Sequence, residues 1–192
     1  TGQINVELKK PENSDRWFLN GYANQGGRTE LNINAAQRVS DRVSTGVLLH
    51  GNLRPFEVDG NNDGFMDFPS GYQLNAINRW RFEQRNGWEG QAGANILTED
   101  RQGGQLSSET AVPKYQLGWN TNRAELWGKT GYIFPKAKYR SIGFQGSALY
   151  HEQSSFYGSR QYDSEQRSGY FNSIYQSIIG TSTHKYRAGL SV

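Results

Sequence analysis

The heptapeptide TELNINA, residues 29–35, decides the fold class of this chain. Two sets of positions alternate strictly along it: Thr29, Leu31, Ile33 and Ala35 on one side, and Glu30, Asn32 and Asn34 on the other. A period of two residues is that of a β-strand, whose successive side chains point to opposite faces. The segment therefore predicts a strand with one apolar and one polar face.

The same period returns along most of the chain. It is clear in RVSTGVLLHGNLR (42–54), GWEGQAGANIL (87–97) and SIGFQGSALYH (141–151), and weaker in 123–134 and 165–179. No helical period of comparable length competes, so the sequence predicts an all-β chain. The alternating runs last roughly ten residues or more, whereas sandwich strands typically have ~5–6. A strand tilted across a bilayer needs ~9–11 residues.

The expected connections fall into two classes. The short ones are 39–42, 85–87, 135–139 and 180–184, and the long, polar ones are 55–71, 100–121 and 153–164. Short and long alternate, which places each class at one edge of an antiparallel sheet; only a tight connection at 25–27 breaks the alternation. Short turns at one rim and long loops at the other are typical of outer-membrane β-barrels, with the long loops outside the cell.

The composition fits this interpretation. Hydrophobic residues make up 34% of the 192 residues and mean hydropathy is −0.82, low for a packed core, but 13% aromatic residues and 23 glycines argue against disorder. In a barrel only alternate residues face lipid, so low hydropathy is expected. The net charge of +3 is too mild and scattered to predict nucleic-acid binding. There is no cysteine, which excludes thiolate sites, and no spacing of catalytic residues predicts an enzyme.

Aromatic residues near the ends of the expected strands admit two interpretations. They suit the girdles of a barrel, where a ring lies at the membrane–water interface, or they fill a soluble core. The girdle is favoured because the sequence holds no second apolar layer to cover so large a sheet. These residues are Trp80, Phe82, Trp88, Tyr132, Phe134, Tyr150 and Tyr186.

Four segments resemble one family. GQINVELKKP (2–11) looks like the last plug strand of TonB-dependent outer-membrane receptors, and residues 20–52 look like their first barrel strands and first periplasmic turn. KTGYIFP (129–135) and YQSIIGTSTHKYRAGLSV (175–192) are similar to later strands of that family. The resemblance implies that 1–15 hold the last plug strand and its connection. It implies that 16–192 form about nine strands, the N-terminal portion of a larger, probably 22-stranded, transmembrane barrel.

The resemblance also implies a function. These receptors import scarce nutrients across the outer membrane, and a metal chelate of the siderophore or cobalamin type is the expected small-molecule substrate. The expected partners are the lipid bilayer, the rest of the barrel, and TonB, which would act through a plug and coupling box outside this sequence. The alternative is an outer-membrane adhesin without transport activity, or a calcium-stiffened β-sheet binding protein at the cell surface.

The segment DGNNDGFMD, residues 59–67, predicts a calcium-binding loop. Oxygen-bearing side chains alternate around Gly64, as in the first half of an EF-hand loop, but Ser70 stands where the bidentate Glu would be. A weak structural Ca²⁺ site is therefore expected, with a turn-rich loop capped by its own Asn and Asp side chains as the alternative. The expected ligands are Asp59, Asn61, Asp63, the Phe65 carbonyl and Asp67.

Other polar residues give weaker signals. His50 and His151 are expected on the lumen face and His184 elsewhere, so a zinc triad is disfavoured. Five lumen-side basic residues could contact an anionic ligand, but pairing with Glu83, Glu89 and Glu125 across neighbouring strands is the favoured interpretation. The five are Arg54, Arg79, Arg81, Arg123 and Lys129.

Overall fold

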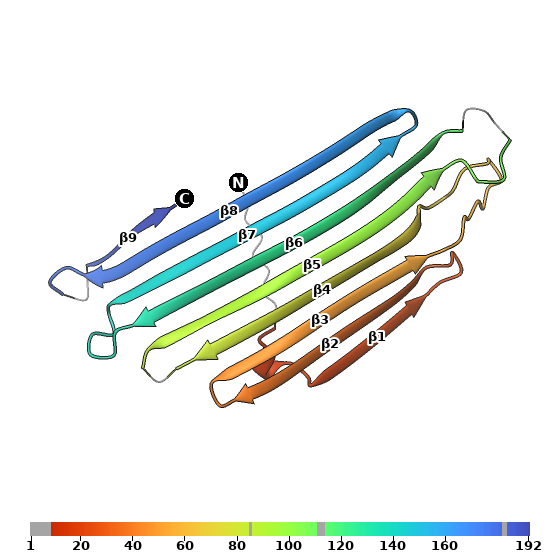
Figure 1. Ribbon diagram of the computed structural model, residues 1–192. Helices are drawn as coiled ribbons and strands as arrows, with labels where there is room; N and C mark the ends of the chain where they lie inside the picture. The colour runs from red at the N-terminus through yellow and green to blue at the C-terminus, as the bar shows by residue number, and fades with distance from the viewer. Residues whose placement is uncertain (1–8, 85, 111–113, 182–183) are drawn as a thin grey trace.

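The chain folds as a β-sheet with almost no helix, as Figure 1 shows. The computed structural model describes residues 9–84, 86–110, 114–181 and 184–192. A 3₁₀ turn, η1 (Pro11–Asn13), precedes the strands. The strands are β1 (Trp17–Ala23), β2 (Thr29–Ser40), β3 (Val43–Arg54), β4 (Ser70–Glu83), β5 (Trp88–Gly104), β6 (Gln116–Ile133), β7 (Ser141–Tyr157), β8 (Arg160–Ile178) and β9 (Lys185–Ser191).

All nine strands lie in one antiparallel sheet, in the order of the sequence from β1 to β9. Each strand pairs with its neighbours in sequence, and β1 and β9, among the described strands, each pair on one side only, so the sheet is not closed. The all-β class and the expected number of about nine strands are confirmed. No helix in the described part of the chain has the length and apolarity to cross a membrane.

The register gives the sheet two distinct faces, because directly opposed residues on neighbouring strands share a face. One row of opposed residues is Leu19, Ile33, Leu49, Ala76, Ile96, Ala124 and Tyr150, and we call its side the apolar face. The next row is Asn20, Asn32, His50, Asn75, Leu97, Arg123 and His151, on the polar face. The alternation predicted for 29–35 and 42–54 is confirmed residue by residue.

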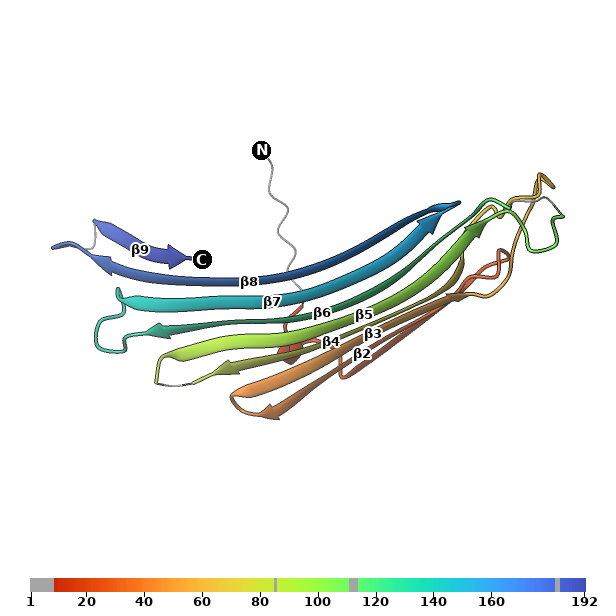
Figure 2. The ribbon, with the colours of Figure 1, turned by 45° about the horizontal axis from the view of Figure 1, so that its top comes forward.

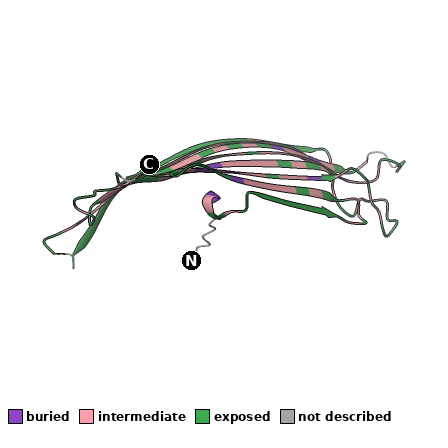
Figure 3. Cartoon of the chain, turned by 90° about the horizontal axis from the view of Figure 1, so that it is seen from below, coloured by how far each residue is buried: buried purple, intermediate pink, exposed green. Residues whose placement is uncertain are grey.

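The sheet is a single curved layer, whose curvature Figure 2 shows in an oblique view. Among the apolar side chains of the described strands, only Ala36 is buried, at 8% exposure, and Pro11 of η1 is the other buried apolar side chain that the structure describes. Large apolar side chains remain exposed along the apolar face, for example Ile96 at 61% and Leu126 at 63%. Figure 3 accordingly shows almost no buried residues across the sheet. The described residues therefore contain no hydrophobic core of their own.

η1 lies against the polar face, on the concave side of the sheet in Figure 3. It packs on β2, β3 and β4, and Pro11 is buried over Gly46 of β3, where an added Cβ would lie 3.6 Å from the Pro11 ring. The approach of the chain to β1 is thus held against the sheet. The plug strand expected at 2–11 lies mostly outside the described residues, which begin at Lys9.

The expected connections are partly corrected. The loop between β3 and β4 has nearly the expected bounds, 55–69, while the loop between β5 and β6 shrinks to 105–115. The long loop expected at 153–164 is wrong: β7 continues to Tyr157, β8 begins at Arg160, and two residues connect them. This hairpin has no apolar alternation in its sequence, and polar bonds join its two strands instead. For example, Ser154 Oγ donates to Asp163 at 2.6 Å.

Candidate functional site: the polar face of the sheet

A ladder of hydrogen bonds crosses the polar face from β1 to β4. Asn32 donates to Asn20 at 3.3 Å, and His50 Nδ1 lies 2.7 Å from the Asn32 side-chain oxygen. Asn52 contacts His50 Nε2 at 3.2 Å and donates to Gln73 at 2.8 Å. One tautomer of His50 satisfies the ladder, with the proton on Nδ1. On this side, amide and imidazole groups add side-chain hydrogen bonds to the backbone pairing of these four strands.

Arg101 of β5 extends the ladder across a strand. Its guanidinium donates through Nε to Glu99 at 3.1 Å and through Nη2 to the side-chain oxygen of Asn52 on β3. The side chain therefore passes over β4, which lies between the two strands. Asn52 is 7% exposed and bonds to His50, Gln73 and Arg101 together, which makes it the centre of the network.

Several buried polar atoms on the same face have no hydrogen-bond partner among the residues that the structure describes. A buried donor or acceptor left unpaired costs about 1–3 kcal/mol, so such atoms indicate contacts with something else. They lie on adjacent strands of one face, which makes that face suited to bind a polar ligand or polypeptide. The atoms are Arg54 Nε, Asn75 Oδ1, Asn95 Oδ1, Arg123 Nε and His151 Nδ1.

A hollow of about 890 Å³ lies on the polar face toward the short turns. Trp127 lies on its floor over Gly93, where an added Cβ would come 2.6 Å from the indole ring. Lys10, from the segment before β1, reaches its edge. The remaining polar lining consists mainly of Arg79, Arg81, Glu89, Gln91, Glu125, Lys129, Gln145 and Asn172.

Ionic contacts hold the segment before β1 against this face. Glu12 accepts a hydrogen bond from Ser44 Oγ at 3.0 Å and forms an ion pair with Arg81, while Arg79 donates to the Lys9 carbonyl at 3.2 Å. Burial by itself raises the pKa of the Glu12 carboxyl. Hydrogen bonds from its backbone and from Ser44, with the nearby Arg81 charge, outweigh that effect and leave the pKa below its ordinary value.

The predicted basic residues follow two patterns. Arg81 pairs with Glu83 at 3.1 Å and Arg123 with Glu125 at 3.2 Å, so acidic partners are confirmed for these two. The pairs lie within one strand, two residues apart, and the expectation of pairing across neighbouring strands is wrong for them. Arg54 instead lies with its Cζ 4.6 Å from the ring centre of Phe68.

The histidines are placed apart. His50 and His151 share a row of the polar face, as expected, with β4, β5 and β6 between their strands. At about 4.8 Å per strand spacing they lie roughly 19 Å apart. His184 lies in the turn before β9. The three therefore do not converge on one site.

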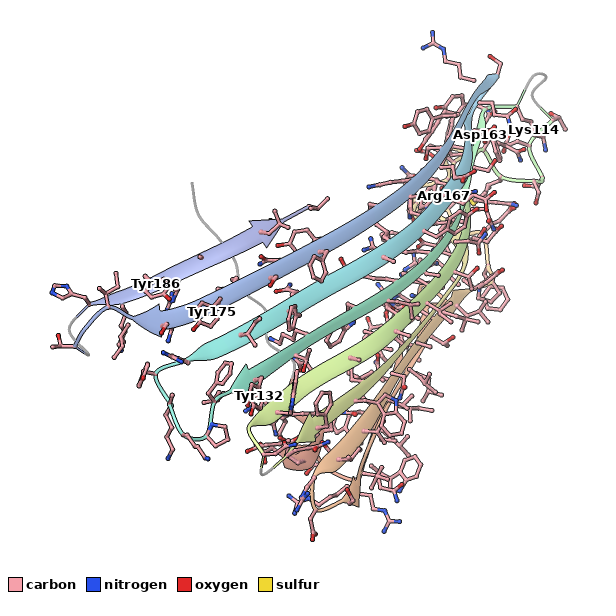
Figure 4. All side chains as sticks on the ribbon, turned by 60° about the vertical axis from the view of Figure 1, so that its left-hand side comes forward. Lys114, Tyr132, Asp163, Arg167, Tyr175 and Tyr186 are labelled. Carbon is pink, nitrogen blue, oxygen red and sulfur yellow. The ribbon has the colours of Figure 1, made fainter. Side chains whose placement is uncertain are left out.

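The loops 55–69 and 105–115 dock on each other. Glu57 accepts hydrogen bonds from the Ser107 backbone and hydroxyl at 2.9 and 2.8 Å, and the Leu106 amide donates to the Gly64 carbonyl at 2.9 Å. Lys114 donates to the Ser107 carbonyl at 2.6 Å. Figure 4 shows Lys114 at the end of the sheet opposite Tyr132, Tyr175 and Tyr186. Two connections far apart in sequence thus form one rim.

The predicted calcium ligands lie in the first of these loops and bond to its own backbone. Asp59 accepts from the Gly64 amide at 2.9 Å, Asp63 from the Phe65 amide at 2.9 Å, and Asp67 from the Gly60 amide at 2.9 Å. Asn61 donates to Asp63 at 2.9 Å. Among the described residues, no three or more His, Asp or Glu side chains are grouped to hold a metal ion. Calcium binding stays a prediction.

Sequence reasoning missed Glu12, Asn52, Gln73, Arg101 and Trp127. Arg101 and Trp119 fall in the segment 100–121, which the sequence predicts as a long loop, so the sequence does not place them on the polar face. The alternation in 42–54 predicts Asn52 on the polar side of its strand, but its central role depends on the register between β3 and β5. Glu12 gave no signal, because a charge outside a strand carries no periodicity.

Comparison of the chain with protein-family models, with curated proteins and with solved structures finds no match. The function is therefore inferred from the sequence and from the geometry of the two faces.

Proposed function

We propose that this chain is the N-terminal portion of the β-barrel of a TonB-dependent outer-membrane receptor. In this proposal the complete protein imports a scarce nutrient, most simply a metal chelate of the siderophore or cobalamin type. The chain acts as a receptor and transporter rather than an enzyme. The remaining strands close the barrel, and a plug couples it to TonB.

The apolar face is the observation that carries the proposal. On β4 its side chains run from Phe82 to Tyr72, which spans about 34 Å along the strand at ~3.4 Å per residue. A tilt of about 35–45° reduces this to about 25 Å, the height of the apolar band of outer-membrane barrels. So large an exposed apolar surface needs a cover, and lipid provides one for a single layer.

Aromatic rings mark the margin of this band near the short turns. Trp88 and Tyr132 lie on the apolar face with ring centres 5.0 Å apart, and Tyr175 and Tyr186 follow on the same face at 6.1 Å. Figure 4 shows Tyr132, Tyr175 and Tyr186 at one end of the sheet. Rings at this position suit a membrane–water interface.

Three polar side chains of the apolar face, those of Asn78, Thr45 and Thr130, form hydrogen bonds inside the chain. Asn78 donates to the Gly46 carbonyl at 3.3 Å and accepts from Trp80 Nε1 at 2.7 Å. Thr45 and Thr130 donate to backbone carbonyls at 2.9 and 3.0 Å. In lipid no water would replace these bonds, so their presence supports a membrane-facing surface.

Under this proposal the polar face lines the lumen. Its unpaired polar atoms would contact the plug or the substrate, and the segment that docks through Glu12 would be the connection between plug and barrel. The loops 55–69 and 105–115 would then face the outside of the cell, and the short turns the periplasm.

Cysteine labelling in intact outer membranes tests the proposal. Leu126 on the apolar face is 63% exposed in the chain by itself, and Gln145 on the polar face is also exposed. We expect a water-soluble thiol reagent to modify Gln145→Cys and to leave Leu126→Cys unmodified, because lipid covers position 126. Equal labelling of both would instead favour a surface adhesin or a soluble binding module.

A further inference from the structure

Two arginines flank a position without a side chain at the loop end of the polar face. Arg54 ends β3 and Arg101 lies on β5, and both are opposite Gly71 of β4 in one row. Gly71 has φ +128°, and an added Cβ would collide with the Asp100 carbonyl oxygen. The backbone therefore requires glycine there. As a result, the position between the two arginines has no side chain.

The guanidinium of Arg101 crosses this bare position. It donates to Asn52 on β3, and Asn52 stands two residues before Arg54 on the same face. Both positive charges are therefore brought to the end of β3. The crossing is possible because Gly71 offers no side chain to block it.

Arg54 is oriented but not neutralised. Its Cζ lies 4.6 Å from the ring centre of Phe68, and its buried Nε has no hydrogen-bond partner in the described part of the chain. Glu99 bonds to Arg101 at 3.1 Å, and Glu30, opposite Asn52 on the same face, pairs with Arg28. Among the described residues Arg101 has an ion pair and Arg54 has none, so the positive charge of Arg54 is left without an acidic partner. Arginine forks match the geometry of carboxylate and phosphate groups.

We infer that Arg54 and Arg101 form an arginine clamp that binds an oxyanion, a carboxylate or phosphate group of a ligand, over Gly71. Trp119 faces Arg101 on the next strand and supplies an aromatic wall beside the clamp. This inference rests on the proposed function, in which the polar face lines the lumen, and it deepens it: the substrate carries negative charge and meets the clamp near the docked loops 55–69 and 105–115.

Anion binding to the full-length protein in detergent tests the clamp. The probes are citrate, ferric citrate and pyrophosphate, which separate carboxylate from phosphate recognition. We expect at least one to bind, and Arg54→Gln and Arg101→Gln each to weaken it by about tenfold or more, since bonds to charged groups are the strong ones. Arg101→Lys, which keeps the charge but loses the fork, should fall between wild type and Arg101→Gln.

Arg38→Gln is the matched control. Arg38 lies on the same face, but near the C-terminal end of β2, at the end of the sheet with the short turns. It should bind the probes as the wild type does, and heat-dependent gel mobility should show that all variants fold. Equal binding by wild type and the Arg54→Gln/Arg101→Gln double variant, or binding of none of the three anions by the wild type, would overturn the clamp. The labelling contrast between positions 126 and 145 is independent of either result, so failure of the clamp and failure of the proposed function are distinguishable.

Discussion

Glu12 shows how single residues position the chain before the first strand. It combines a hydrogen bond from Ser44 with an ion pair to Arg81, and it is mostly buried against the polar face. Arg81 has a second acidic partner, Glu83, whose side chain is 64% exposed. The two carboxylates therefore contribute differently to stability. Glu12 fixes the segment before β1 to the sheet, whereas Glu83 lies in solvent, where ion pairs contribute little.

The first prediction concerns this docking. Glu12→Gln should loosen the segment by about 1–2 kcal/mol, because Arg81 and Ser44 lose a charged acceptor. Glu83→Gln should have almost no effect. Trypsin cleavage after Lys9 measures both variants, since the docked segment resists the protease. Equal cleavage of the two variants would show that Glu12 does not hold the segment.

The same carboxyl predicts a pH dependence. The pKa of Glu12 is lowered on docking from its ordinary 4.5, so its contribution is complete above pH 4.5 and is lost as the pH falls through the lowered value. Acid-stable pepsin can report docking at low pH. Protection of the segment should fall with pH in the wild type and stay flat in Glu12→Gln, whose side chain does not titrate.

The third prediction concerns the loop 59–67. Three carboxylates in this short loop repel one another, so millimolar Ca²⁺ should order it and slow its proteolysis. Asp63→Ala should remove that protection without changing assembly of the sheet. Glu57→Gln is the control, because Glu57 joins the loop to Ser107 rather than to the expected site. If Ca²⁺ does not protect the wild-type loop, the loop is only a turn. Its carboxylates then serve to accept hydrogen bonds from backbone amides.

At the scale of elements, the hairpin of β7 and β8 shows where prediction from the sequence fails. Segments with strict alternation, such as 29–35, gave the strand, its faces and its pairing. Residues 153–164 carry polar side chains on both faces, and their aromatic residues at 156, 157 and 162 do not alternate, so no period distinguishes strand from loop. The pairing is seen in the backbone register and in cross-strand bonds such as that from Ser155 Oγ to the Tyr162 carbonyl at 2.8 Å. The same cause hid Arg101, because a strand end without apolar residues resembles a loop.

The fourth prediction tests that hairpin. Gly158 has φ +61°, a conformation that costs other residues about 1–2 kcal/mol. Gly158→Val should lower the temperature at which the folded form is lost on a denaturing gel, whereas Ser159→Val should leave it nearly unchanged. No difference between the two variants would mean that this connection is not a tight turn.

The whole molecule is polarised from one end to the other. One end holds short turns and aromatic rings, and the other holds the docked loops, Lys114, Asp163 and Arg167 (Figure 4). The alternation of apolar and polar residues in the sequence predicts the apolar and polar faces of the sheet. The site could not be predicted from this alternation, because its network depends on side chains that reach past the neighbouring strand, as Arg101 does to Asn52.

The fifth prediction follows from this polarity. In the proposed orientation an epitope tag inserted at 61–62 or after Gly158 should be stained on intact cells, because both sites lie at the end with the docked loops. A tag at 136–138, in the turn between β6 and β7, should be stained only after the outer membrane is opened. The opposite pattern would invert the orientation, and staining of all three would argue against a membrane-spanning sheet.

The sequential order of the strands also bears on how such a sheet can change during evolution. Because every strand pairs with its neighbours in sequence, a whole hairpin can be duplicated or deleted while the remaining pairs keep their partners and their faces. A single inserted residue within a strand acts differently, since it turns every later side chain of that strand to the opposite face. Length variation that selection retains should therefore come in pairs of strands or in loops, and rarely inside a strand.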